Sequence, residues 1–248
     1  MNELEIAEFT DDAMMSCHCA PIFFLPSATA PPAGVAANGT IALLDTGQRK
    51  ILVTCWHVWD EFLAYSQKHP GASLCTVFAN GPTWPIVIPA ESLIDSEPSL
   101  DLAVFVATPE SWNMGWKNFF RINCWPVPKA RKGDPISFLG FPGALRDTSR
   151  GVGDFGAFVL CATVSDVSHR GLVIARAPDS EGHLVDSRGK KLQPLEVGGL
   201  SGCPAYVRDA KWRPSLAGFV HMGTKTNADI FLIHAAFLNP DGTITRAN

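Results

Sequence analysis

The heptapeptide GGLSGCP, which runs from Gly198 to Pro204, places one hydroxyl among glycines and ends in proline. Glycine adopts backbone conformations that a Cβ atom forbids, so the segment predicts a tight turn that presents the side chain of Ser201. The same turn would aim the amides of Gly199 and Ser201 at one point. Two amides about 3 Å from an oxygen that gains negative charge form an oxyanion hole. A serine in such a loop is more often just part of a turn, so other segments have to decide its role.

Two upstream segments contain the partners that a reactive serine requires. The β-type run KILVTCWHV (50–58) carries His57 near its end, and SLDLAVFV (99–106) has Asp101 at the head of an apolar strand. A serine hydroxyl needs an adjacent base, and that base needs a group that fixes its tautomer. The chain order is histidine, aspartate, serine, which differs from the Ser–Asp–His order of α/β-hydrolases. These residues form the candidate catalytic triad.

In order and spacing, these segments resemble those of the trypsin-like (chymotrypsin-fold) serine peptidases. TCWHV (54–58) is similar to the family's Thr-Ala-Ala-His segment, SLDLA (99–103) to its Asp-(Ile/Leu)-Ala strand, and GLSGCP (199–204) to its Gly-Asp/Asn-Ser-Gly-Gly-Pro loop. A fourth segment, LAGFVHMG (216–223), follows the serine where the family has its substrate-pairing strand. The resemblance extends over roughly residues 38 to 240.

The resemblance implies a serine endopeptidase that needs no cofactor and cleaves protein or peptide substrates through an acyl-enzyme. Ser201 would be the nucleophile, His57 the base that takes and returns the proton, and Asp101 the group that holds the imidazole. The amides of Gly199 and Ser201 would form the oxyanion hole. Two alternatives stay open. One is a catalytically silent peptidase-fold module that binds a partner. The other is an intracellular protease that an activating protein partner or a ligand switches on.

Two residues of the serine loop depart from the family's sequence. Leu200 stands where secreted members carry an aspartate that pairs with the new N-terminus after zymogen cleavage, so that route of activation is not expected. Cys203 replaces the second glycine after the serine. It is either a small core residue or an oxidation-sensitive neighbour of the site. The missing activation device is the reason that both alternatives stay open.

The resemblance also indicates which residues would contact substrate. The pocket floor lies about six residues before the serine, at Leu195, which predicts an uncharged floor; a shift of one residue places Glu196 there and favours Lys or Arg. Asp229 falls near the opposite pocket wall and would add negative charge. A buried carboxylate needs a partner, so a basic substrate residue is favoured. His221 and Gly223 lie on the substrate-pairing strand, and viral 3C-type peptidases have a pocket histidine in a similar Gly-Ile-His segment.

Successive short apolar runs predict an all-β chain with two six-stranded-type antiparallel β-barrels and the active site in the cleft between them. The expected division is an N-terminal segment (1–37), a first barrel (38–108) with His57 and Asp101, an interdomain connection (109–132), and a second barrel (133–248) with Ser201. A short helix is expected over 60–68 and a polar link over 89–98. The expected strands lie at 21–26, 40–45, 50–54, 74–79, 83–89, 101–107, 134–143, 155–167, 171–177, 216–222 and 230–237.

Composition limits the class of function. Hydrophobic residues make up 46% of the 248 residues and charged residues 18%, which is enough for a sizeable core. The net charge of −4 gives no electrostatic reason to expect nucleic acid or an anionic membrane as partner. No apolar run is long enough to span a bilayer. The N-terminal MNELEI lacks the features of a secretory signal, and seven scattered cysteines predict reduced thiols and a cytoplasmic location. CHC (17–19) has no second Cys/His pair at zinc spacing, so no metal site is expected.

Overall fold

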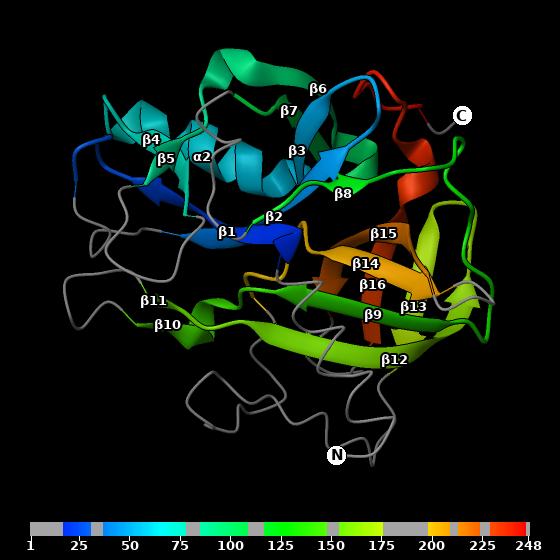
Figure 1. Ribbon diagram of the computed structural model, residues 1–248. Helices are drawn as coiled ribbons and strands as arrows, with labels where there is room; N and C mark the ends of the chain where they lie inside the picture. Colours follow the sequence, from blue (N-terminus) through cyan, green and yellow to red (C-terminus); the bar gives the residue numbers. More distant parts are fainter. Residues whose placement is uncertain are drawn as a thin grey trace.

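Two β units lie one above the other in the computed structural model (Figure 1). The structure describes residues 17–30, 37–77, 85–108, 117–147, 154–175, 198–208, 213–223 and 229–246. Strands dominate both units, so the expected all-β class is confirmed. Within the described ranges, no helix combines the length and the apolar character that crossing a membrane requires. None of the seven cysteines, all of which lie in those ranges, forms a disulfide bond.

The first unit is one eight-stranded sheet in which the strands follow the order β5-β4-β1-β2-β3-β7-β6, with β8 paired to β2. All neighbours are antiparallel except β2 and β8, which run parallel. Within the described residues this sheet does not close, so it is a half-barrel rather than the closed barrel that was expected. Its strands are β1 (Cys19–Leu25), β2 (Asn38–Asp45), β3 (Lys50–Thr54), β4 (Ser73–Thr76), β5 (Ile86–Val87), β6 (Leu93–Glu97), β7 (Leu102–Val106) and β8 (Phe120–Arg121).

The second unit is a closed barrel of six strands, as expected, in the order β12-β13-β16-β15-β14-β9. Its core is apolar and includes Leu200 and Cys203, which come from the serine loop itself. The barrel strands are β9 (Pro135–Gly140), β12 (Phe158–Val167), β13 (Gly171–Ala175), β14 (Pro204–Arg208), β15 (Pro214–Gly223) and β16 (Asp229–His234), beside a separate pair, β10 (Arg146–Asp147) and β11 (Asp154–Phe155).

The principal helix, α2 (Trp56–Lys68), begins directly after β3. Val58, Trp59 and Phe62 are its buried residues and pack against the first sheet, with the Trp59 ring 5.3 Å from that of Phe105. The helix starts four residues before the one that the sequence predicted over 60–68. His57, expected just past the end of a strand, therefore lies in the first helical turn. Short 3-10 turns complete the chain: η2 (Ala90–Ser92), η3 (Pro98–Leu100), η5 (Gly143–Leu145) and η6 (Ala235–Phe237).

Several strands, among them β1, β6 and β14, lie where the sequence did not predict one or placed it outside the first barrel. β1 falls within residues 1–37 but pairs with β2 and β4, so the first sheet begins at Cys19. The polar link expected over 89–98 contains β6, which pairs with β7. β14 follows the serine loop directly and pairs with β9 and β15.

One apolar cluster joins the two units. It contains Leu44 and Val104 from the first sheet and Tyr206 and Phe219 from the barrel. The connecting segment contributes Phe120, whose ring lies 4.8 Å from that of Tyr206. Burial of shared apolar surface stabilises the relative position of the two units, which is what a site with residues from both requires.

Candidate active site

Asp101 is the centre of the site. The 3-10 turn η3 ends at this residue, and Asp101 adopts the left-handed backbone conformation (φ 51°, ψ 46°) before β7 begins. Aspartate is one of the few non-glycine residues that tolerate this conformation. The turn leaves the carboxylate buried, with 8% of its side chain exposed. The side chain of Glu97 accepts a hydrogen bond from the Ser99 amide and so caps the turn.

His57 donates two hydrogen bonds, one to each oxygen of this carboxylate. Its backbone amide donates to Oδ1 of Asp101 at 2.8 Å, and its Nδ1 lies 2.7 Å from Oδ2. A carboxylate only accepts, so the geometry assigns the ring proton to Nδ1 and leaves Nε2 as a base. The histidine is 39% exposed and can reach a bound substrate. The sequence-predicted pair is therefore brought together in the orientation that general-base catalysis requires.

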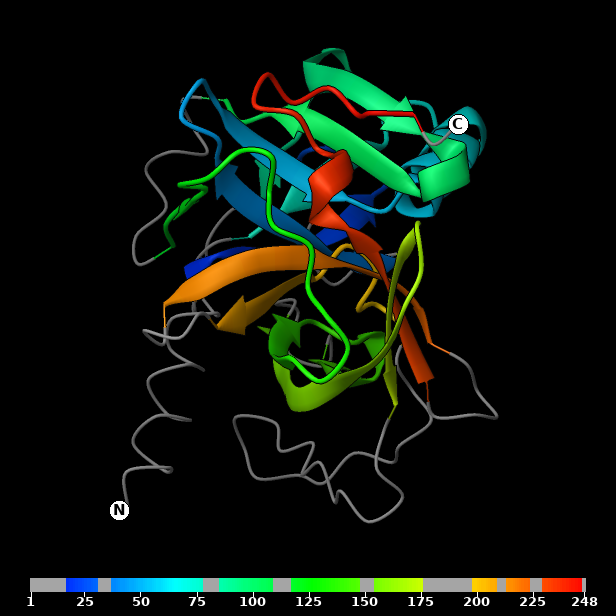
Figure 2. The same ribbon diagram turned by 90° about the vertical axis from the view of Figure 1, so that its right-hand side faces the viewer.

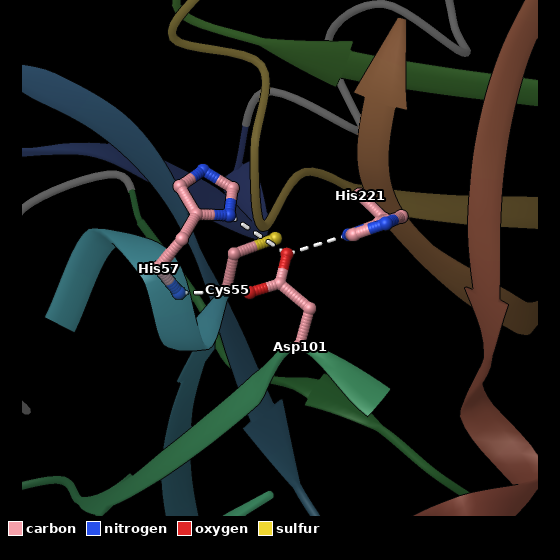
Figure 3. Close-up of side chains that lie close together, drawn as sticks. All are labelled: Cys55, His57, Asp101 and His221. Carbon is pink, nitrogen blue, oxygen red and sulfur yellow. Dashed lines mark hydrogen bonds and ion pairs between the residues drawn. The ribbon is translucent and has the colours of Figure 1, made fainter. Parts of the chain in front are cut away.

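A second histidine contacts the same carboxylate. Nδ1 of His221 lies 2.6 Å from Oδ2 of Asp101, the oxygen that also accepts from His57 (Figure 3). His221 comes from β15, in the barrel, whereas Asp101 belongs to the first unit. The sequence placed His221 on the substrate-pairing strand, and its contact with Asp101 was not predicted. No local signal reveals a partner 120 residues away.

The pKa shifts follow from these contacts. Burial alone would raise the pKa of Asp101, but the hydrogen bonds from His221 and His57 outweigh it and hold that pKa well below its usual range. Burial lowers the pKa of His57, yet its bond to Asp101 and the charges of Asp101 and Glu61 raise it above the ordinary value. Cys55 lies beside the pair, and burial together with the charge of Asp101 raises the pKa of its thiol well above normal.

The serine loop is anchored to both units. The carbonyl of Ser201 accepts from the Thr40 amide on β2 at 2.9 Å, and the Gly202 amide donates to the carbonyl of Val220 on β15 at 2.8 Å. Gly199 and Gly202 have positive φ angles of 97° and 88°, which favour glycine. At Gly202 there is a second constraint, since a Cβ would collide with backbone and side-chain atoms of Thr40 and Thr54. These contacts fix the loop against the strand that precedes His57.

Two features of the loop bear on its chemistry. Among the described residues, the amides of Gly199 and Ser201 donate no hydrogen bond. The same set contains no hydrogen bond between the Ser201 hydroxyl and His57. Catalytic hydrogen bonds are often long in unliganded enzymes and tighten when substrate binds. Leu200, at the position of the family's aspartate, is buried in the barrel core at 2% exposure.

Besides His221, the sequence predicted four residues that would contact substrate. Leu195 and Glu196 lie outside the described residues. Gly223 pairs with Ile230 at the end of β15, and Asp229 opens β16 and pairs with Ala175. Their roles in substrate binding stay predictions.

Comparison with known proteins was made on sequence and on structure. No protein-family model and no curated protein matches the chain. Solved structures do match. A thermostable serine protease, AL20, from an extremophilic microorganism is 13% identical over 88% of this chain and 91% of its own, with a TM-score of 0.53. Deg5 is 14% identical over 94% of this chain and 91% of its own, also at 0.53. Human heparin binding protein is 10% identical over 90% and 88%, again at 0.53. The chain has the chymotrypsin fold.

The chymotrypsin fold confirms the resemblance found in the sequence at the level of architecture. His57 and Asp101 come from the first unit, while Ser201 and His221 come from the second. Cys55 immediately precedes α2 and donates to the carbonyl of Val220 at 3.2 Å. The site is therefore a junction of the two units rather than a property of either one.

Proposed function

We propose that the protein is a serine endopeptidase. The observation that carries the proposal is the double hydrogen bonding of His57 by Asp101, at the ring nitrogen and at the backbone amide. That arrangement supports a neutral imidazole with Nε2 directed away from the carboxylate, which is the form needed to accept a proton from a hydroxyl.

In the proposed reaction, Ser201 Oγ attacks the carbonyl carbon of the scissile peptide bond while His57 Nε2 takes the hydroxyl proton. The amides of Gly199 and Ser201 donate to the carbonyl oxygen as it becomes negative. The C–N bond then breaks, and the amine leaves with the proton from His57. A water molecule attacks the acyl-enzyme, gives its proton to His57, and the carboxylic acid product departs as Ser201 regains a proton.

Throughout the reaction, Asp101 orients His57 and stabilises its protonated form. Because its own pKa is held low, it stays ionised over the whole range in which His57 titrates. An ionised Asp101 stabilises the imidazolium that forms during both steps. Protein or peptide substrates follow from this chemistry. A preference for a basic residue rests on Glu196 and Asp229 and is part of the proposal.

A binding module without catalysis is the second candidate. Two observations favour it: the serine hydroxyl has no hydrogen bond to His57 among the described residues, and one protein of this fold is named for heparin binding. A cytoplasmic protease that needs an activating partner or ligand accounts for the first observation equally well. Each candidate predicts a different response to a reagent that reacts with an assembled site.

The test is labelling of the purified protein with a fluorophosphonate probe, alongside Ser201→Ala and His57→Ala. We expect labelling of the wild type and none in either variant, because Ser201→Ala lacks the nucleophile and His57→Ala lacks the base that activates it. Ser215→Ala, a serine on β15 outside the site, is the matched control and should be labelled like the wild type. Unlabelled wild type contradicts an enzyme that is active at rest; labelling that appears only after a partner is added identifies the regulated protease.

A further inference from the structure

Four side chains around the carboxylate form a more crowded cluster than a triad requires. Cys55, His57, Asp101 and His221 each offer one donor atom, and these four atoms all lie within 4.8 Å of one another (Figure 3). Cys55 and Asp101 are buried, while His57 and His221 are 39% and 31% exposed. The donors are one sulfur, two imidazole nitrogens and one carboxylate oxygen. Zn²⁺ prefers this set, usually with four ligands in a tetrahedron.

We propose that Cys55, His57, Asp101 and His221 bind a Zn²⁺ ion and that the bound ion blocks the triad. The binding itself follows from the cluster alone. The blocking rests on the proposed peptidase function, because it requires His57 to be the catalytic base.

The distances fit a tetrahedral site after small movements. With zinc bonds of 2.0–2.3 Å, the donor atoms of such a site lie about 3.3–3.8 Å apart. Here the two histidine nitrogens lie 2.7 and 2.6 Å from Asp101 Oδ2, and no pair in the cluster exceeds 4.8 Å. Shifts of about 1 Å therefore convert the hydrogen-bonded cluster into a metal site. Both rings are partly exposed, which gives an ion access from solvent.

The charges also balance. The Cys55 thiol loses its proton to solvent as the Zn–S bond forms, and Asp101 is already ionised. Each imidazole coordinates through Nδ1 in its neutral form, with its proton on Nε2. Two negative ligands thus neutralise the two charges of the ion, which lowers the free-energy cost of burying it.

Two of the four ligands take no direct part in the proton transfers of the proposed hydrolysis. His57 and Asp101 belong to the triad, but Cys55 and His221 do not react with substrate. Cys55 stands at the first alanine of the Thr-Ala-Ala-His segment that its surroundings resemble. Without a cysteine and a histidine at these two positions, only two ligands would remain. The pair is what turns a triad into a four-ligand cluster.

Coordination would inactivate the base. An ion on Nδ1 of His57 breaks the bond to Asp101 and puts the ring proton on Nε2, so that nitrogen cannot accept the proton of Ser201. Inhibition would be reversible, since a chelator that removes the ion restores the hydrogen-bonded pair.

The experiment measures binding and activity separately. Zn²⁺ affinity is measured by calorimetry and the coordination sphere by Co²⁺ substitution, which gives intense visible bands for a tetrahedral site and an ultraviolet charge-transfer band for a thiolate ligand. We expect Cys55→Ala and His221→Ala to weaken Zn²⁺ binding at least about tenfold, and Cys55→Ala to remove the thiolate band. Cys55→Ser, which keeps the size of the side chain, replaces Cys55→Ala if that variant does not fold.

Matched controls separate this site from surface ligands and from catalysis. Cys124→Ala and His169→Ala, which alter exposed residues, should bind Zn²⁺ like the wild type. Ser201→Ala should also retain the affinity, because the serine is not a ligand. Addition of Zn²⁺ should stop fluorophosphonate labelling of the wild type, and EDTA should restore it.

The outcomes are decisive in each direction. Unchanged affinity in both Cys55→Ala and His221→Ala, or a Co²⁺ complex without the thiolate band, overturns the metal site. Binding at the four residues without any effect on labelling overturns the block alone. If the wild type is never labelled but binds the ion through these residues, the peptidase proposal fails and the metal site stands.

Discussion

His57 and His221 approach one carboxylate from opposite units of the molecule, and they are held differently. His57 binds both oxygens of Asp101, through Nδ1 and through its own backbone amide. His221 binds only Oδ2, through Nδ1, from the C-terminal part of the barrel strand β15. The backbone bond ties His57 to the first turn of α2, so its orientation relative to Asp101 is set twice. His221 instead orients Asp101 from the other unit.

The two histidines therefore have different roles at the one carboxylate of Asp101. The pKa of His57 is raised by Asp101 despite burial, as suits a base that gains a proton during reaction. The hydrogen bond from His221 helps to hold the pKa of Asp101 low, together with the hydrogen bonds from His57. We therefore assign His57 as the base and His221 as a positioning residue that acts through Asp101. Three measurements test this assignment, in order of decreasing expected effect.

The largest effect is expected from Asp101→Asn, which removes the partner of both histidines. An amide can donate to Nδ1, so the proton of His57 moves to Nε2 and the base is lost. We expect the fluorophosphonate labelling rate to fall about 10⁴-fold. Asp60→Asn, an exposed acid on α2, should leave the rate unchanged. If Asp101→Asn were labelled as fast as the wild type, the basicity of His57 would not depend on Asp101.

A smaller effect is expected from His221→Ala, which leaves His57 with its carboxylate but removes one hydrogen bond from it. We expect a loss of about tenfold in labelling rate, the value of one bond to a charged group. Asp101 then interacts more strongly with His57, so the pH profile of labelling should move to higher pH. His221→Asn places an amide donor near the same position and should restore most of the rate. A rate loss without any movement of the profile would indicate a structural role only.

The smallest effect is expected in the wild type, in the pH dependence of its labelling rate. Protonated His57 cannot accept a proton, so labelling should rise with pH through an apparent pKa above the ordinary histidine value of about 6.5. The raised pKa stabilises the fold below that ordinary value, and the contribution is lost as pH rises through the raised pKa. Asp101 contributes above its ordinary pKa of about 3.9 and loses this as pH falls towards its depressed one. Thermal unfolding measured across pH reports the stability contributions of His57 and Asp101. An apparent pKa of labelling below 6.5 would contradict the hydrogen bond between the two residues.

The sequence predicted those features of the fold and of the site that depend on residues close together in the chain. Apolar strands, the turn at Gly202 and the order of His57, Asp101 and Ser201 are visible as short segments, and the fold follows from them. Each of these features depends on residues that are neighbours in the chain. The structure accordingly pairs His57 with Asp101 as predicted.

Long-range partners were beyond the reach of that reasoning. β6 was predicted as a polar link because it contains Asp95 and Glu97, but Arg246 lies 2.8 Å from a carboxylate oxygen of each. Likewise, His221 gave no local sign that its ring would meet Asp101. Polar residues in strands are stabilised by groups that only the folded chain brings near, so charge patterns along a segment mislead.

The open first sheet has a further consequence, at its edges. An unpaired edge strand offers free amides and carbonyls to another chain and so favours aggregation. One edge here, β5, is only two residues long. At the other, β6, the C-terminal segment returns from the barrel and lies alongside (Figure 2), with the Ile244 amide bonded to Asp95 and Gly242 packed on Ile94. The last turn of the chain thus shields the sheet that carries Asp101 from edge-to-edge association with its own copies.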